Sequence, residues 1–231
     1  MTRMKGIAFV TFVALALAAY APEAAANPTG ISSCQTITES GAYILTQSVA
    51  AIGPAACIVV AADFITLDLD GQVLTGDGTG DGISDNGVQR KGTVVRNGMI
   101  TKFINGINLG ESRNSTIEKV RAIGNAGFGI LFSGSSTITG NTASNNGEGM
   151  HAIGGSSIIT GNIANNNGGD GIVTAGSNTI SGNTTNGNRE NGIDITCPSN
   201  LFDNMARGNA GGNLHTIVLG GACQLSNNLF P

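Results

Sequence analysis

The sequence predicts an all-β protein: a single-domain right-handed parallel β-helix with about seven to eight coils of roughly 21 residues each. Three observations predict this fold class: an internal repeat, turn residues that interrupt every repeat, and a low content of charged residues. Charged residues make up 11% of the chain, and 36 of its 231 residues are glycine. This composition is typical of short strands joined by many turns.

The repeat is clearest between residues 136 and 204. Segments 136–142, 157–163 and 178–184 read S-T-I-T-G-N-T, S-I-I-T-G-N-I and N-T-I-S-G-N-T. One column of apolar residues has one member in each of these repeats. A second column has nearly the same period, and each of its residues follows a glycine. The first column contains Ile138, Ile159, Ile180 and Leu201, and the second contains Ile107, Ile130, Met150, Ile172 and Ile193. We expect both columns to form ladders in the core.

An asparagine column has the same period and contains Asn141, Asn162, Asn183 and Asn204. Asparagine tolerates left-handed backbone at a turn, and stacked amides can hydrogen-bond from coil to coil. Helical repeats are excluded because Gly-Asn and Asn-Asn-Gly steps interrupt the chain too often. Local alternation instead indicates strands, as in Ile65, Leu67 and Leu69, which alternate with polar residues.

Residues 1–26 have the pattern of a secretory signal peptide. Arg3 and Lys5 precede an apolar stretch over residues 7–19, and three alanines end at Ala26. We expect an exported protein, periplasmic or extracellular, cleaved near Ala26. An uncleaved anchor is the alternative, but the apolar run is short for a membrane span. We expect no transmembrane span in the mature chain, and the net charge of −4 argues against a nucleic-acid partner.

The mature chain is interpreted as one domain. Residues 27–62 are expected to form the N-terminal cap and first strands, and residues 63–231 the β-helix with a C-terminal cap. Four cysteines, Cys34, Cys57, Cys197 and Cys223, lie in this part. An oxidising compartment favours two disulfides. Of the three connectivities, we favour Cys34–Cys57 and Cys197–Cys223, because each pair is about one coil apart; free thiols are the alternative.

The G-I-x-x-x…S-N-T-I-S-G-N-T-x-x-N-N-G rhythm over residues 60–215 resembles the pectin-lyase-like superfamily of right-handed parallel β-helices. It is similar to repeats shared by carbohydrate-binding and sugar-hydrolase proteins, and to the periplasmic NosD-like family linked to copper maturation. This resemblance implies a polysaccharide lyase, hydrolase or epimerase, or a member without catalysis. The chain lacks the Asn-Thr-Asp, Asp-Pro-His and Arg-x-Pro-x-x-Arg motifs of the enzymes.

Stacking the coils brings candidate catalytic residues to one edge of the helix. The residue before each Gly-Ile step forms a column of Asp81, Asn105, Phe128, Glu148, Asp170 and Asn191. Glu148 and Asp170 are therefore expected to be about 5 Å apart, with His151, Asp194 and Arg189 nearby. Such a pair could share a proton or serve a glycosidase, and His151 or Arg189 could act as a base. Solvated turn residues are the alternative interpretation.

Cofactors are not expected, apart from calcium. Asp77 and Asp81 lie in a Gly-Asp-Gly run that is faintly similar to a calcium-binding repeat. Copper requires clustered His, Met or Cys, whereas Met150 falls in a core column and His215 has no evident partner in the sequence. Phe128 is the one aromatic side chain expected to offer a sugar platform.

Three functions remain open on the sequence. The favoured one is an exported, non-catalytic β-helix that binds glycans or serves the cell-envelope surface. The second is a polysaccharide lyase, hydrolase or epimerase with a site at the acidic edge. The third is a NosD-like periplasmic metal-handling protein. The oligomeric state cannot be read from the chain.

Overall fold

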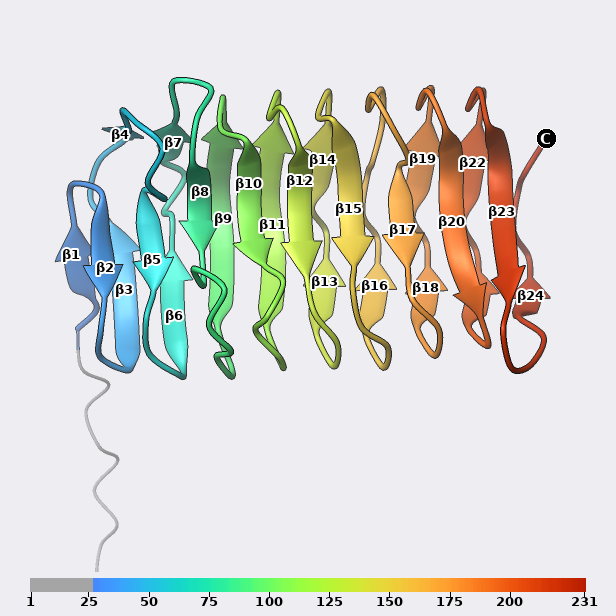
Figure 1. Cartoon of the computed structure of the whole chain (residues 1–231), viewed down its shortest axis with the longest axis horizontal. Coiled ribbons are helices and arrows are strands. Elements are labelled where there is room, and N and C mark those ends of the chain that lie inside the picture. The colour runs from blue at the N-terminus through green and yellow to red at the C-terminus, as the bar shows by residue number, and fades with distance from the viewer. Residues whose placement is uncertain (1–26) are drawn as a thin grey trace, which may run out of the picture.

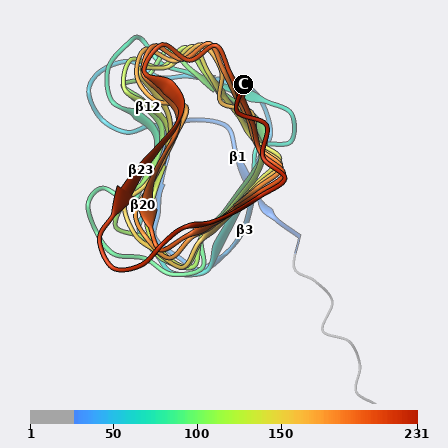
Figure 2. The same ribbon diagram turned by 90° about the vertical axis from the view of Figure 1, so that its right-hand side faces the viewer.

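The computed structural model describes residues 27–231, which form 24 β-strands wound into a right-handed parallel solenoid. The predicted signal peptide lies outside the described residues. Successive turns stack along one axis from β1 to β24 (Figure 1) and superimpose into one closed outline when viewed along that axis (Figure 2). Within residues 27–231, no helix has the length and hydrophobicity needed to cross a membrane.

One sheet takes one strand from every turn. Its nine strands are β2 (Gln35–Ile37), β5 (Ile58–Val60), β8 (Asp81–Ser84), β10 (Asn105–Leu109), β12 (Phe128–Phe132), β15 (Glu148–Ala152), β17 (Ile172–Thr174), β20 (Asn191–Cys197) and β23 (Gly212–Val218). All of its pairings are parallel.

A second, 13-stranded sheet forms the opposite wall. Ten of its strands follow one another as β1 (Thr29–Ile31), β3 (Gly41–Leu45), β6 (Ile65–Asp68), β9 (Val94–Thr101), β11 (Thr116–Ile123), β13 (Thr137–Thr139), β16 (Ile158–Thr160), β18 (Thr179–Ser181), β21 (Asn200–Phe202) and β24 (Gln224–Ser226). The strands beside this path are β4 (Val49–Ala50), β7 (Val73–Thr75) and β14 (Thr142–Ser144), and a two-stranded sheet pairs β19 (Thr184–Asn186) with β22 (Met205–Arg207).

The predicted fold class is confirmed, but the number of coils needs correction. The described chain makes about nine turns, one for each strand of the nine-stranded sheet, where the sequence predicts seven to eight. The first turns are longer than the repeat, because Gln35 pairs with Ile58 and Ile58 pairs with Ile83. A search for the shorter period of the later coils therefore misses them.

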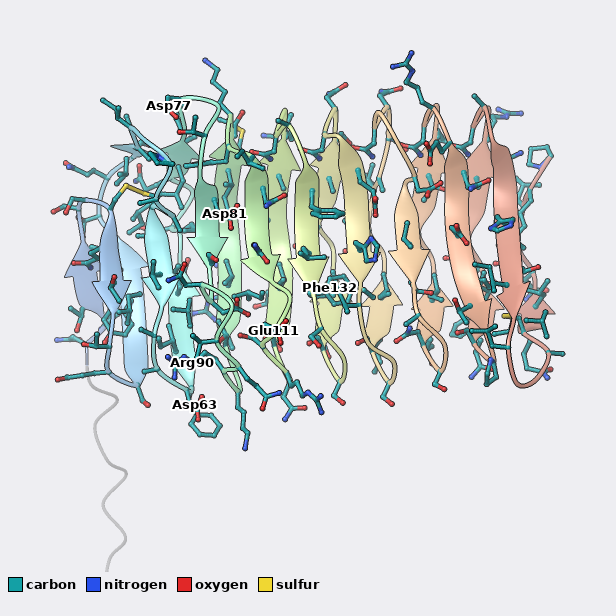
Figure 3. All side chains as sticks on the ribbon, in the orientation of Figure 1. Asp63, Asp77, Asp81, Arg90, Glu111 and Phe132 are labelled. Carbon is teal, nitrogen blue, oxygen red and sulfur yellow. A yellow bond between two sulfur atoms is a disulfide. The ribbon has the colours of Figure 1, made fainter. Side chains whose placement is uncertain are left out.

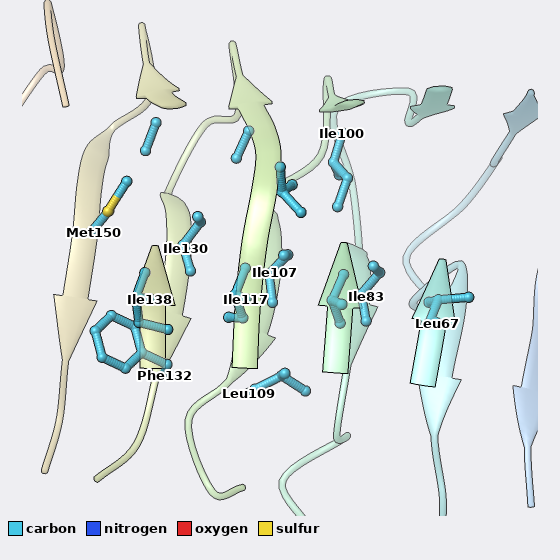
Figure 4. Close-up of a cluster of buried hydrophobic side chains, with 14 of the residues drawn as sticks. Leu67, Ile83, Ile100, Ile107, Leu109, Ile117, Ile130, Phe132, Ile138 and Met150 are labelled. Carbon is cyan, nitrogen blue, oxygen red and sulfur yellow. The ribbon is translucent and has the colours of Figure 1, made fainter. Parts of the chain in front are cut away.

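Both predicted apolar columns are core ladders. In the first, Ile138 pairs with Ile159 and Ile159 with Ile180; in the second, Ile130 pairs with Met150. All the residues of these two columns are fully buried. Figure 4 shows Ile107, Ile130 and Met150 of the second ladder together with Ile138 of the first in one cluster of buried apolar side chains. Each turn thus removes apolar surface from water only because its neighbours cover it.

The asparagine column is a buried hydrogen-bond ladder. Asn162 Nδ2 donates to Asn183 Oδ1 (3.0 Å) and to the carbonyl oxygen of Ile138 (2.9 Å). The left-handed residue at this turn is the preceding glycine, with φ of 64° at Gly161, and not the asparagine. A second ladder, which the sequence interpretation missed, contains Asn125, Asn146, Asn167, Asn188 and Asn209.

The favoured disulfide pairing is confirmed. Cys34 is bonded to Cys57 and Cys197 to Cys223, with Cα–Cα distances of 4.4 Å and 5.0 Å. The first disulfide joins the first two turns of the nine-stranded sheet, and the second lies at the last turn. Each disulfide therefore ties an end of the solenoid, where a strand has a neighbour on one side only.

Candidate functional site

The outer surface of the nine-stranded sheet presents polar and aromatic side chains in register. In β10, β12 and β15, two consecutive residues, a glycine and then Ile or Met, are buried between partly exposed first and fourth residues. The glycine is needed for packing, because a Cβ on Gly129 would lie 2.7 Å from the carbonyl oxygen of Gly149 on the next turn. The Gly-Ile step therefore brings residues three apart to the same outer surface.

These positions form two columns that run along the solenoid axis. The first contains Asp81, Asn105, Phe128, Glu148, Asp170 and Asn191, and the second contains Asn108, Leu131, His151, Val173, Asp194 and His215. Neighbouring members of a column are one strand spacing apart, about 4.8 Å. We call this surface the outer sheet face.

A carboxylate–histidine pair lies at the middle of the outer sheet face. His151 Nδ1 is 2.7 Å from Glu148 Oε1, and both side chains are partly exposed. The ring of Phe128, on the preceding turn, meets the His151 ring edge-on with centroids 5.4 Å apart. An ionised carboxylate only accepts hydrogen bonds, so a neutral His151 donates from Nδ1 and its Nε2 is the basic nitrogen.

A second carboxylate–histidine pair lies further along the same column. His215 on β23 pairs in register with Asp194 on β20, and His215 Nδ1 is 2.9 Å from Asp194 Oδ1. The sequence interpretation left His215 without a partner. The sequence feature that could have revealed this pair is the separation of His215 from Asp194, which equals one repeat. The solenoid turn that contains Val173 lies between this pair and the turn that contains His151.

The predicted Glu148–Asp170 pair does not share a hydrogen bond. The two residues lie on neighbouring turns, where Gly149 N donates to the carbonyl oxygen of Asp170 (3.0 Å). Their carboxylates have different partners, because Asp170 Oδ1 accepts from Asn191 N (2.6 Å) while Glu148 binds His151. Burial raises the pKa of Asp170, and the nearby charges of Asp194 and Glu190 raise it further. Asp170 thus links its own turn to the next one through a hydrogen bond.

Arg189 lies apart from both carboxylate–histidine pairs. Its side chain is exposed in the turn before β20, and its backbone N–H donates to the carbonyl oxygen of Asn167 (3.0 Å). A hollow of about 480 Å³ lies at the turns that follow β12, β15 and β17, and it is lined by Arg113, Ile153 and small residues. None of the five candidate catalytic residues lines this hollow.

The two calcium candidates serve separate hydrogen-bond networks. Asp77 lies on the loop between β7 and β8, whereas Asp81 is on β8 itself (Figure 3). Asp77 Oδ2 accepts from Gly53 N (2.8 Å), and hydrogen bonds from Thr79 and Gly53 lower the pKa of Asp77. Asp81 accepts from the side-chain amides of Asn105 and Asn108. Across residues 27–231, no three His, Cys, Asp or Glu side chains gather as metal ligands would.

Residues 37–184 and 81–230 match the family described as the right handed beta helix region, and the chain belongs to this family. The expected resemblance to pectin-lyase-like β-helices is thereby confirmed at the level of the fold. A comparison with curated proteins finds no match.

Among solved structures, the chain is similar to the catalytic domain of Agl-KA, with a TM-score of 0.58 and 16% identity over 88% of this chain. It spans 44% of that domain, less than half its length. It is also similar to the periplasmic alginate epimerase AlgG, with a TM-score of 0.52 and 16% identity over 79% of this chain and 61% of AlgG. At these identities the likeness concerns the fold.

Proposed function

We propose that this protein is an exported glycan-binding β-helix that holds a polysaccharide along its outer sheet face. The observation that carries the proposal is the cluster of Phe128, Glu148 and His151, which combines an aromatic ring with a hydrogen-bonded polar pair. Sugars offer both C–H faces and hydroxyl groups, so an aromatic surface beside fixed donors and acceptors suits them. AlgG, which has a similar fold, is an epimerase of the polysaccharide alginate.

The regular spacing of the outer sheet face supports a polymeric ligand. Polar side chains recur on successive turns over several strands, from Asp81 to His215. An extended chain lying parallel to the solenoid axis would meet a new turn about every 4.8 Å. Export is supported by the two disulfides, which persist in oxidising compartments, and by the signal pattern of residues 1–26.

Proton abstraction from a sugar, as in a lyase or an epimerase, is a second candidate function. The Glu148–His151 hydrogen bond favours it, because a carboxylate on Nδ1 fixes the tautomer that leaves Nε2 basic. The outer sheet face offers no Lys or Arg beside His151 to neutralise a developing charge. The geometry therefore supports binding better than it supports turnover.

A glycan array followed by affinity measurements tests the proposal. We expect binding without cleavage or epimerisation, and we expect His151→Ala and Phe128→Ala to weaken binding about tenfold each, since central contacts of this kind contribute about 1.4 kcal/mol or more. Thr160→Ala, on the opposite sheet, is the matched control and should bind normally. Unchanged binding by both site variants would show that the ligand binds outside the outer sheet face.

The same preparations distinguish binding from catalysis. Products from each bound glycan are followed by ultraviolet absorbance for unsaturated sugars and by NMR for epimers. Turnover that disappears in His151→Ala, while Thr160→Ala retains it, would establish the enzyme function and overturn the non-catalytic one.

A further inference from the structure

Arg113 lies beside the hollow of about 480 Å³ at the turns that follow β12, β15 and β17. Of the described residues that line this hollow, Arg113 is the one with a charge, and the others are serines, glycines, Ile153 and Ala175. A volume of this size falls within the range of small-molecule sites in proteins. The hollow is therefore largely polar, and its charge is positive.

Hydrogen bonds to the preceding turn fix the loop that carries Arg113. Asp85 is 2% exposed, and its Oδ2 accepts from Glu111 N (3.0 Å), Ser112 N (2.9 Å) and Ser112 Oγ (2.9 Å). Arg113 N donates to the carbonyl oxygen of Arg90 (2.8 Å). Because this backbone is already ordered, binding of a ligand at the Arg113 guanidinium costs less entropy.

The Arg113 guanidinium has no ion-pair partner in the described part of the chain, where the ion pairs involve Arg96, His151 and His215. Its side chain is exposed. Lys91 pairs in register with Arg113 on the neighbouring turn. Two like charges on neighbouring strands repel each other, and an anion bound beside them would relieve the repulsion.

A third cation at this corner, Arg90, has a buried Nε without a hydrogen-bond partner in residues 27–231. The acidic side chains of the same turns form no ion pair with these cations. Asp63 accepts a hydrogen bond from Lys91 N (3.0 Å), and Asp85 binds the loop described above. The corner thus presents cations that no carboxylate of the described chain contacts directly.

Three serine hydroxyls lie along the hollow. Ser135, Ser156 and Ser177 hold equivalent positions on successive turns, and Ser156 N donates to the carbonyl oxygen of Ser177 (2.9 Å). Their φ angles are 59°, 65° and 65°, a left-handed region that asparagine occupies more readily than serine. On the turn before Ser135 the equivalent residue is Asn114, with φ of 54°. Backbone conformation therefore does not account for serine, whereas an exposed hydroxyl is a hydrogen-bond donor to the hollow.

The hollow borders the outer sheet face. Ile153 and Ala175 on its wall follow His151 and Val173 by two residues. Ile153 N donates to the carbonyl oxygen of Phe132 (3.0 Å), which continues the parallel ladder beyond the strand ends. Side chains two residues apart in extended backbone lie on the same side of a sheet, so the hollow opens next to the His151 column.

We infer that this hollow is a binding site for an oxyanion group, a sulfate, phosphate or carboxylate, with Arg113 as its counter-ion and the serine hydroxyls as further donors. A guanidinium binds such groups through two parallel charge-assisted hydrogen bonds. The group is either a free anion or a substituent of a glycan on the outer sheet face, and the second source rests on the proposed function.

Titration of the purified full chain with sodium sulfate at constant ionic strength, followed by NMR chemical shifts, tests the site. We expect saturable shifts at the Arg113 side chain and at the backbone N–H groups of Ser135, Ser156 and Ser177. Arg113→Gln should raise the dissociation constant about tenfold or more, since it removes the charge-assisted hydrogen bonds. The matched control is Arg121→Gln, exposed on β11 of the opposite sheet, which should bind sulfate normally.

The double variant Ser156→Ala/Ser177→Ala distinguishes a built site from attraction by one arginine. Alanine retains the Cβ atom at both left-handed positions, so the backbone cost is unchanged. We expect roughly fivefold weaker binding of sulfate from the loss of two neutral hydrogen bonds. Unchanged binding in this variant, shifts that grow linearly with sulfate, or equal shifts at every exposed arginine would overturn the inference.

A neutral hexasaccharide and its O-sulfated form identify the source of the group. Tighter binding of the sulfated form, by about tenfold and lost in Arg113→Gln, assigns the oxyanion to a glycan. Sulfate binding with equal affinity for the two hexasaccharides assigns the site to a free anion. Sulfate binding without binding of any glycan would reject the proposed function and leave the oxyanion site standing.

Discussion

At the scale of the residue, the buried polar side chains have contacts as well defined as those of the buried apolar side chains. The buried amide of Asn162 takes part in four hydrogen bonds: Asn141 N and Asn141 Nδ2 donate to its Oδ1, and its Nδ2 donates to Asn183 Oδ1 and to the carbonyl oxygen of Ile138. Burial of an amide costs free energy unless each group is paired. The ladder meets this condition by repeating asparagine on successive turns from Asn141 to Asn204.

The variant Asn162→Ala should therefore lower the free energy of unfolding by about 3 kcal/mol, because it leaves buried donors of Asn141 and the Ile138 carbonyl without partners. Urea denaturation followed by circular dichroism measures the loss. Asn200→Ala is the control, since Asn200 is exposed on β21 and should change stability by less than about 0.5 kcal/mol. Equal effects of the two variants would contradict the role of the ladder.

At the scale of the element, strand shape depends on glycine at the Gly-Ile step. The consecutive buried pair in β12 lets Phe128 and Leu131 share the outer sheet face, which strict alternation in a strand would not allow. The space for this pair exists because glycine has no side chain: a Cβ on Gly129 would lie 2.6 Å from Asn146 Nδ2. The same step thus shapes the core and the candidate site.

We predict that Gly129→Ala destabilises the fold by about 2–3 kcal/mol, the usual cost of forcing extra atoms into a packed interior. Thermal and urea denaturation measure it. Gly220→Ala is the matched control, because nothing lies within 4 Å of the added Cβ there. A stable Gly129→Ala protein with an unchanged melting temperature would show that the neighbouring turn adjusts without cost.

At the scale of the whole molecule, each turn is stabilised by the turns that stack on it. In a solenoid each turn contacts only its neighbours, so the ends fray first. The Cys197–Cys223 disulfide links residues 26 positions apart around the last turn, and a loop of this size contributes about 3–4 kcal/mol. The Cys34–Cys57 disulfide serves the first turns in the same way.

Replacing Cys197 and Cys223 with serine should make the last turn labile and leave the middle unchanged. Hydrogen exchange followed by mass spectrometry should show lost protection over residues 212–226 and normal protection in β13 and β16. The matched variant, in which Cys34 and Cys57 become serine, should affect residues 29–60 instead. Uniform loss of protection in either variant would indicate that the solenoid unfolds as one cooperative unit.

The sequence alone was sufficient to predict the fold class, the two core ladders and the disulfide pairs. All three follow from spacing, because a fixed period places equivalent residues one above another in a parallel solenoid. The first turns escaped this reasoning because the offsets from Gln35 to Ile58 and from Ile58 to Ile83 are longer than that period.

Only the tertiary structure decided which neighbours the polar side chains contact. The sequence placed Glu148 beside Asp170. In the structure, the Glu148 carboxylate binds His151 on its own strand, whereas the Asp170 carboxylate accepts a hydrogen bond from a backbone N–H of the next turn. Spacing fixes the position of a Cα atom in a column, whereas the direction of a side chain depends on the donors around it.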